Sequence, residues 1–97
     1  MWARVSSYEF GADENVEEGV RAFERALTAD DFFMEGMRDA YLLVDRTAGT
    51  ALTITLWGSE EALRASEESA DPVRRAAAGD AVRAVDRYEV ALHESFT

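Results

Sequence analysis

Five side chains in this sequence have the chemistry needed to hold an aromatic molecule and to respond to charge on it. Arg38 offers a cation, His93 an imidazole, and Trp57 a large aromatic surface. Tyr8 and Tyr41 each combine an aromatic ring with a hydroxyl that can donate or accept a hydrogen bond. Each of the five also has a purely structural interpretation, as a core aromatic, a strand residue or a surface ion pair. Their spacing alone therefore does not establish a site.

The composition excludes several other kinds of active site. The chain has no cysteine, which removes disulfides and thiolate chemistry, and one histidine, which removes a multi-histidine metal site within one chain. Four serines, Ser6, Ser7, Ser59 and Ser66, have no histidine nearby in the sequence, and neither a nucleophile elbow nor a glycine-rich phosphate loop is present. We therefore expect no metal site and no bound cofactor.

The net charge of the chain limits the classes of molecule that it can bind. Twenty acidic residues stand against ten basic ones, all of them arginine, for a net charge of −10. Nucleic acids and anionic membrane surfaces are unfavourable partners for such a chain, because both attract basic patches. No apolar run is long enough to span a membrane, and the first residues do not resemble a signal peptide. We expect a cytoplasmic protein with one domain over residues 1–97.

The hydrophobic pattern predicts strands and helices in alternation. Strands are expected at residues 2–10, 37–46, 50–57 and 87–94. A first helix is expected where apolar residues recur at helical spacing, at Val16, Val20, Phe23 and Leu27. A second helical region begins at Ser59, and Asp71 followed by Pro72 is interpreted as a further helix start, with Val73, Ala76, Ala77 and Val82 as its apolar residues. The cluster of Phe32, Phe33 and Met34 is either a last helical turn or a loop over the core.

The two middle strands are predicted to form a hairpin whose two-residue turn is Ala48-Gly49. One face of this hairpin then carries Tyr41, Leu43, Asp45, Leu52, Ile54 and Leu56. The other face carries Ala40, Leu42, Val44, Thr53, Thr55 and Trp57. Both faces are largely apolar, so each needs a cover.

The order β-α-β-β-α-β predicts an α+β, ferredoxin-like fold, in which both helices pack on one face of a four-stranded antiparallel sheet. One apolar face of the sheet then stays bare in a single copy. Because exposed apolar faces of this size mark association sites, we expect a homodimer that pairs sheet against sheet about a two-fold axis.

A family resemblance rests on the stretch Leu52-Thr53-Ile54-Thr55-Leu56-Trp57-Gly58-Ser59-Glu60-Glu61-Ala62-Leu63-Arg64-Ala65. A strand that ends in Trp57 and runs into a Ser-Glu-Glu-Ala-Leu helix start resembles the antibiotic biosynthesis monooxygenase family of dimeric α/β barrels. The chain departs from that family at Ser66, where many members have a histidine. Haem-degrading members need a tryptophan there, a ligating histidine near Ala76 and an asparagine near Ser6 or Ser7. None of these is present, so the resemblance does not imply haem degradation.

The resemblance implies a cofactor-independent monooxygenase that oxidises an aromatic or polyketide-like small molecule in a cleft between helices and sheet. Such an enzyme needs a hydrogen-bond acceptor or base, a cation for the substrate anion, and aromatic walls. Tyr8, Arg38, Tyr41, Trp57 and His93 are the residue types available to bind that substrate, and no catalytic residue is identified. Whether the chain is an enzyme stays open. The alternatives are a non-catalytic dimer that binds a small apolar ligand, and a structural module whose cleft is filled by Phe32, Phe33 and Met34.

Overall fold

Four strands and three α-helices make up residues 1–11, 13–29 and 34–96, the part of the chain that the computed structural model describes. The elements are β1 (Trp2–Glu9), α1 (Asp13–Leu27), β2 (Met37–Asp45), β3 (Thr50–Trp57), α2 (Glu60–Ala65), α3 (Glu67–Ala78), a 3₁₀ turn at Gly79–Ala81, and β4 (Val82–Glu89). Phe32 and Phe33, two of the three residues of the predicted apolar cluster, lie outside the described residues. Within the described part, no helix combines the length and the apolar character that crossing a membrane requires.

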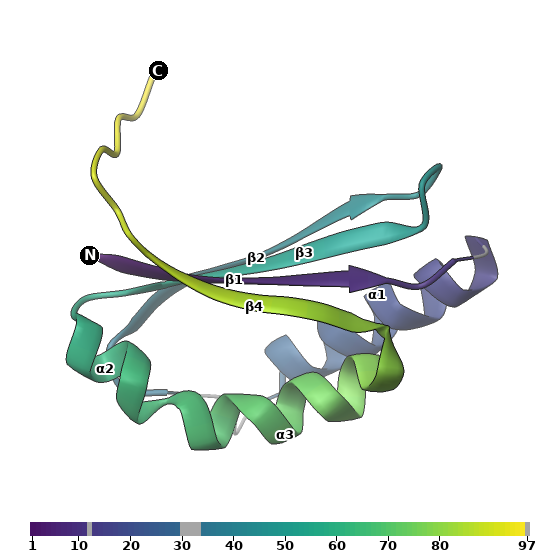
Figure 1. Ribbon diagram of the computed structural model, residues 1–97, viewed down its shortest axis with the longest axis horizontal. Coiled ribbons are helices and arrows are strands. Elements are labelled where there is room, and N and C mark those ends of the chain that lie inside the picture. Colours follow the sequence, from purple (N-terminus) through teal and green to yellow (C-terminus); the bar gives the residue numbers. More distant parts are fainter. Residues whose placement is uncertain (12, 30–33, 97) are drawn as a thin grey trace.

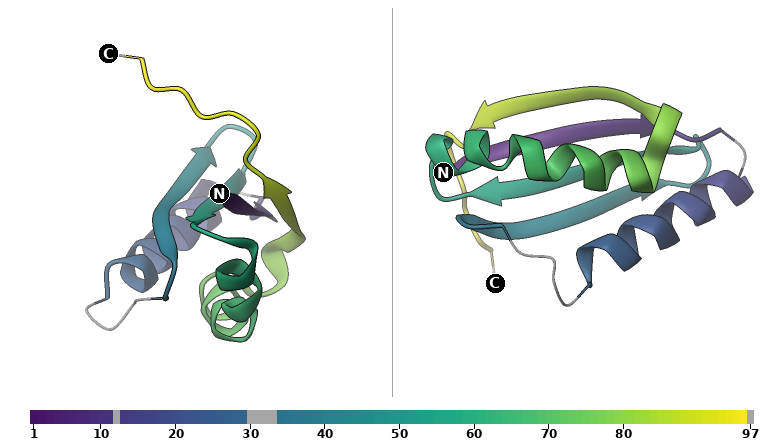
Figure 2. Two further views of the ribbon diagram at one scale, coloured as in Figure 1. Left: turned by 90° about the vertical axis from the view of Figure 1, so that its left-hand side faces the viewer. Right: turned by 90° about the horizontal axis from the view of Figure 1, so that it is seen from below.

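The strands form one antiparallel sheet in the order β2-β3-β1-β4, so the first strand lies in the middle beside the third and the fourth. The helices lie on one face of this sheet, with α3 running beneath β1 and β4 and α1 on the side of β2 (Figures 1 and 2). No helix of the described residues covers the other face, which we call the open face. The predicted α+β, ferredoxin-like fold is confirmed.

The hairpin between β2 and β3 has the predicted faces but not the predicted turn. Asp45 pairs with Thr50, so the loop has four residues, 46–49, instead of two. The backbone N–H of Gly49 donates to the carbonyl of Asp45 at 2.9 Å, and Gly49 has a φ of +74°. This loop moves the register by two residues from the prediction, and side chains alternate with a period of two. Every residue of the hairpin therefore keeps the face that the sequence predicted.

Two boundaries in the second half of the chain were predicted wrongly. The last strand was expected at residues 87–94, but β4 spans Val82–Glu89, and its last residue lies opposite Trp2, the first residue of β1. Val82 thus begins a strand instead of belonging to a helix. Pro72 was expected to start a helix, but it lies inside α3. The helix boundary lies instead at Ser66, between α2 and α3. The carbonyl of Ser66 accepts hydrogen bonds from the N–H groups of Ser69 and Ala70 in the first turn of α3.

The start of α2 follows its sequence signal. The side chain of Ser59 accepts a hydrogen bond from the backbone N–H of Ala62 at 3.1 Å and so caps the helix. Glu60 and Glu61 place negative charge in the first turn, where the helix dipole favours it. This cap fixes the direction in which the chain leaves Trp57.

The face of the sheet toward the helices holds an apolar core at one end and polar groups at the other. Tyr8 packs against Phe23 of α1 with tilted rings whose centroids are 4.9 Å apart, and Ala51 lies in the same cluster. Toward the other end of β1, Ser6 and Arg4 face the helices, and both are buried. The open face instead presents exposed apolar side chains: Tyr41, Leu43, Leu52 and Tyr88. The polar residues thus lie between helices and sheet, where an apolar core would be expected.

Replacing Gly49 by alanine is expected to lower the free energy of unfolding by about 2–3 kcal/mol, because the positive φ is costly for alanine and the new Cβ would lie 2.0 Å from the carbonyl oxygen of Gly11. Urea denaturation measures the change. The matched control is Gly11→Ala, which also has a positive φ but whose Cβ would meet no atom within 4 Å. Equal costs for the two variants would show that the contact between the loop and Gly11 does not constrain the hairpin.

Candidate functional site

A narrow cleft lies between α1, α3 and the sheet. Its volume is about 50 Å³, room for a few water molecules. The residues that line it come from β1, β2, β3 and both long helices: Arg4, Ser6, Tyr8, Phe23, Leu27, Met34, Met37, Thr53, Thr55, Ala70, Val73 and Arg74. Aromatic and aliphatic side chains line the cleft together with hydroxyls and two guanidinium groups. A pocket of this kind, mostly apolar with a few convergent polar groups, is typical of small-molecule sites.

Arg4 is the most unusual group in the cleft. It is only 4% exposed, and its Nη2 donates to the carbonyl of Leu63 at 3.0 Å and to the Ser66 hydroxyl at 2.6 Å. Its guanidinium carbon lies 5.2 Å from the ring centroid of Trp57, a cation–π distance. Its Nε is buried and has no hydrogen-bond partner among the described residues. A buried donor without an acceptor costs free energy, so its presence calls for an explanation.

The nearest carboxylate neutralises Arg4 only weakly. Glu67 lies 3.5 Å from Arg4 Nη2, at the limit of a hydrogen bond, whereas the same oxygen lies 2.6 Å from Nε of Arg87. Glu67 is therefore engaged mainly by Arg87, and this hydrogen bond is the largest cause that lowers the pKa of Glu67. Burial lowers the pKa of Arg4; Glu67 opposes this effect and the charge of Arg74 adds to it. Arg4 is thus a cation with little local compensation.

Arg74 is the second buried guanidinium of the cleft. It is 9% exposed, and its Nη1 donates to the carboxylate of Asp71 at 3.1 Å. The other oxygen of Asp71 is bound by Arg75, whose Nε lies 3.0 Å away. In this network four guanidinium groups, those of Arg4, Arg74, Arg75 and Arg87, share the carboxylates of Glu67 and Asp71. A chain with a net charge of −10 therefore places a local excess of positive charge at its cleft.

Two of the five residues singled out in the sequence lie at the cleft. Tyr8 lines it and shares a 2.9 Å hydrogen bond with the hydroxyl of Thr53. Trp57 is fully buried behind Arg4, and its indole N–H donates to the hydroxyl of Thr55 at 2.9 Å. The prediction that Trp57 faces the same side of the sheet as Thr55 is confirmed by the strand register.

The other three lie elsewhere. Tyr41 is on the open face and half exposed. Arg38 is exposed at an irregularity of β2 between Met37 and Asp39, and a Cβ on Gly58 would come within 3.1 Å of its Nε. His93 is exposed in the segment after β4, which leaves the sheet on the side away from the helices (Figure 1). The structure does not bring these three side chains together with Tyr8 and Trp57.

Sequence reasoning missed the two buried arginines. A signal for Arg4 was present, because strand alternation places it on the same face as Ser6 and Tyr8, and polar residues on a face toward helices are unusual. The hairpin carries a matching signal, since Thr53 and Thr55 alternate with Leu52, Ile54 and Leu56. Arg74 has no comparable signal, because it lies beside Arg75 in a charged helix and either residue could face the solvent.

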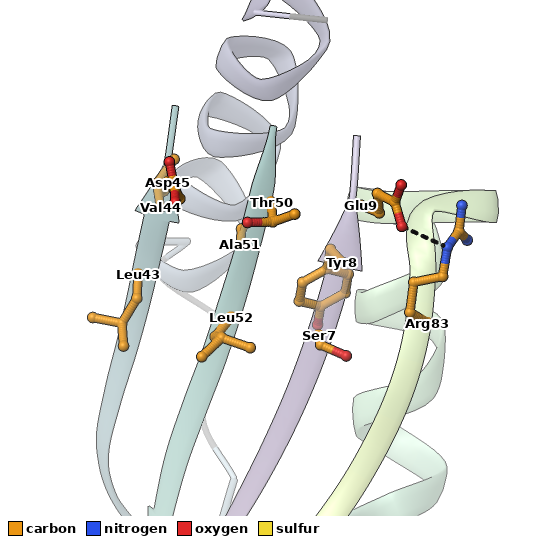
Figure 3. Close-up of a pocket in the computed structure, with 10 residues that line it drawn as sticks. All are labelled: Ser7, Tyr8, Glu9, Leu43, Val44, Asp45, Thr50, Ala51, Leu52 and Arg83. Atoms are coloured by element: carbon orange, nitrogen blue, oxygen red, sulfur yellow. Dashed lines mark ion pairs between the residues drawn. The ribbon is translucent and has the colours of Figure 1, made fainter. Parts of the chain in front are cut away.

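A second hollow lies on the open face near the tip of the hairpin, with a volume of about 440 Å³. Leu43 and Leu52 line it from neighbouring strands, together with Ser7 of β1 (Figure 3). An ion pair between Glu9 and Arg83, with Nε and Oε2 3.5 Å apart, borders it on the side of β4. This hollow is shallow and lies on the opposite side of the sheet from Arg4.

The same arrangement of strands and helices occurs in several solved structures. The haem degrader MhuD of Mycobacterium tuberculosis, solved with two haems bound in its active site, superimposes with a TM-score of 0.66 at 20% identity, covering 98% of this chain and 100% of that one. A candidate antibiotic biosynthesis monooxygenase of Chloroflexus aurantiacus has a TM-score of 0.58 at 17% identity, covering 96% of both chains. Another from Bordetella bronchiseptica has a TM-score of 0.57 at 15% identity, covering 94% of this chain and 97% of that one.

The chain has the fold of the antibiotic biosynthesis monooxygenases. The likeness confirms the resemblance that was drawn from Trp57 and the helix start after it. No family model and no curated protein sequence matches the chain.

A haem does not fit the described part of the cleft. Its volume of about 50 Å³ is far too small for a porphyrin, and the described residues that line it include no histidine. Ser66, at the position where haem-degrading members need a tryptophan, here holds the guanidinium of Arg4. In residues 1–11, 13–29 and 34–96, no three side chains of histidine, aspartate or glutamate gather as metal ligands would.

Proposed function

We propose that this chain is a small cofactor-independent monooxygenase that acts on an aromatic or polyketide-like molecule in the cleft between helices and sheet. The observation that carries the proposal is the buried guanidinium of Arg4, which lines that cleft and whose Nε has no hydrogen-bond partner among the described residues. An aromatic phenol must become an anion before it reacts with O₂, and a buried cation beside it stabilises that anion. The resemblance suggested Arg38 for this role, and the proposal assigns it to Arg4.

The proposed reaction needs only the substrate and O₂. Arg4 lowers the pKa of a phenol bound beside it, so the hydroxyl proton leaves to water. The phenolate then reduces O₂: one oxygen atom becomes a carbonyl at the ring carbon opposite the hydroxyl, and the other leaves as water, which takes the hydrogen of that ring carbon and one proton from the solvent. The ring is oxidised to a quinone and O₂ is reduced, so atoms and electrons balance. Tyr8 and Phe23 supply aromatic walls, and Trp57 supports the guanidinium from behind.

Turnover under air tests the proposal. 1-Naphthol, a phenol with a free carbon opposite its hydroxyl, is incubated with the protein in buffer containing a chelator, and naphthoquinone is measured by its absorbance and by mass spectrometry after labelling with ¹⁸O₂. We expect quinone with one labelled oxygen from the wild type and at least a tenfold lower rate from Arg4→Met. Quinone formation that equals the rate without protein would refute the proposal. Activity that appears only with added haem, with a Soret band, would also refute it.

A non-catalytic binding module is the second candidate. The observation that favours it is the small volume of the cleft, together with the absence of a carboxylate or histidine among the described residues that line it. A module of this kind would bind 1-naphthol without consuming O₂. Binding and oxygen uptake, measured on the same sample, separate the two functions.

We also propose that the chain works as a homodimer that pairs open face against open face. The open face carries exposed apolar side chains on three strands, Tyr41 and Leu43 of β2, Leu52 of β3 and Tyr88 of β4. The segment after β4 leaves on the same side, and its Leu92 and Phe96 are almost fully exposed (Figure 1). A second copy would cover both sets, since a two-fold axis pairs one apolar patch with itself. The paired sheets would close the dimeric α/β barrel that the resemblance implies.

Sedimentation velocity at micromolar concentration is expected to show a dimer of the 10.8 kDa chain. The variant Leu43→Asp should sediment as a monomer, because it places a charge within the proposed interface. The matched control is Ala76→Asp, which introduces the same charge at an exposed position of α3, on the other side of the sheet (Figure 1), and should leave the dimer intact. A wild-type chain that sediments as a monomer would refute the pairing.

A further inference from the structure

We propose that the helix–sheet cleft recognises aromatic acids, with Arg4 and Arg74 binding the carboxylate of the ligand. The inference takes the location of the site from the proposed function and adds the chemical class of its ligand. It concerns binding alone, so it can stand or fall independently of turnover.

The first step is the unfilled hydrogen-bonding capacity of Arg4. Its Nη2 is engaged by Leu63, Ser66 and, at 3.5 Å, Glu67, while its buried Nε has no partner in the described residues. A guanidinium that is 96% removed from solvent retains its charge and needs an acceptor for each donor. A ligand carboxylate in the cleft would supply an acceptor for the Nε–H.

The second step is the presence of another buried guanidinium among the residues that line the cleft. Arg74 lines the cleft from α3 and contacts Asp71 through one of its two terminal nitrogens. Asp71 is shared with Arg75, and Glu67 is held mainly by Arg87. The carboxylates of the network are thus divided among more guanidinium groups than they can neutralise. One further carboxylate, bound between Arg4 and Arg74, would restore the balance and form charge-assisted hydrogen bonds.

The third step is the chemistry of the other residues that line the cleft. Tyr8, Phe23 and Leu27 present apolar surface to the cleft, and the hydroxyls of Thr53 and Thr55 lie on the strand next to Arg4. An acid with an aromatic body would place its ring against the first group and its carboxylate on the guanidinium groups. Met34 and Met37 also line the cleft and are partly exposed, and the flexible thioether side chain of methionine can rearrange to enlarge a small cavity.

Titration calorimetry and thermal shift with benzoate and benzamide test the inference. The two probes have nearly the same shape, but only benzoate carries a charge at pH 7. We expect benzoate to bind and to raise the melting temperature, and benzamide to bind at least tenfold more weakly. Equal affinities, or no binding of either probe, would overturn the inference.

Two variants separate recognition in the cleft from a general effect of charge. Arg74→Gln is expected to weaken benzoate binding at least tenfold. Arg75→Gln is the matched control: it removes the same charge from the neighbouring residue, bound to the same Asp71, but Arg75 is 76% exposed and does not line the cleft. The affinity of Arg75→Gln for benzoate should stay within twofold of the wild-type affinity. Equal losses in the two variants would show that benzoate responds only to the net charge and would overturn the assignment of Arg74.

The outcome is distinguishable from that of the proposed function. Benzoate binding without oxidation of 1-naphthol supports the ligand class and contradicts the monooxygenase. Oxidation of 1-naphthol with no preference for benzoate over benzamide supports the monooxygenase and contradicts the ligand class.

Discussion

Replacing Trp57 by alanine is expected to lower the free energy of unfolding by about 3–5 kcal/mol. The side chain is fully buried between the end of β3 and the guanidinium of Arg4, so its removal leaves a large cavity and takes away the cation–π contact. Urea denaturation of the two proteins at equal concentration measures the change, because a dimer makes apparent stability depend on concentration.

The variant Trp57→Phe separates packing from hydrogen bonding. It retains most of the apolar volume but cannot donate to the hydroxyl of Thr55, so we expect a loss of about 1–2 kcal/mol. Both variants should still sediment as the wild type does, because Trp57 faces the helices and not the open face. A Trp57→Ala protein as stable as the wild type would contradict the burial of this side chain.

Replacing Arg4 by methionine is expected to raise the free energy of unfolding by about 1–4 kcal/mol. The change removes a charge that is costly to bury and that Glu67 compensates poorly at 3.5 Å. The change leaves no buried hydrogen-bonding group without a partner. The Ser66 hydroxyl still donates to the carbonyl of Leu63 at 2.6 Å, and Glu67 keeps its ion pair with Arg87. Methionine also packs favourably against the ring of Trp57. Thermal and urea denaturation should both show the gain.

The matched control is Arg87→Met, which removes the other cation bound to Glu67 from a side chain that is partly exposed. We expect no gain there, and a loss of at most about 1 kcal/mol, because exposed ion pairs contribute little. The gain in Arg4→Met should come with the loss of benzoate binding and of turnover. A marked loss of stability in Arg4→Met would show instead that the arginine is a structural link between β1 and the junction of α2 and α3.

The element order and the faces of the strands could be predicted from the sequence, because they depend on periodicity alone. The hairpin shows this most clearly: its loop is two residues longer than predicted, yet Tyr41 and Trp57 lie on the predicted faces. The end of β4 could not be predicted from its own residues. Val90 and Leu92 continue the alternation of the strand, yet the pairing with β1 ends where Glu89 lies opposite Trp2, and the length of a strand depends on its neighbour.

The candidate site was harder to predict than the fold. The sequence identifies Trp57 and Tyr8 because large aromatics are conspicuous, but it does not show that Arg4 lies over the indole ring. That contact depends on the turn of the helical chain at Ser66, where the sequence suggested a break near Pro72 instead. Arg4 and Arg38 are the same residue type on two strands of one sheet, β1 and β2, and the residue type alone does not show that Arg4 is the buried one.

The contact between Gly49 and the end of β1 connects the two sides of the sheet mechanically. The carbonyl of Gly49 accepts hydrogen bonds from the N–H groups of Phe10 and Gly11, at 2.8 and 3.3 Å, just before α1 begins. A force on the hairpin from a second copy on the open face is therefore transmitted to the start of α1. That helix supplies Phe23 to the cleft on the other side. If two copies pair on the open face as proposed, their association and the width of the cleft are expected to be coupled, and a ligand that spreads the cleft should then change the affinity between the copies.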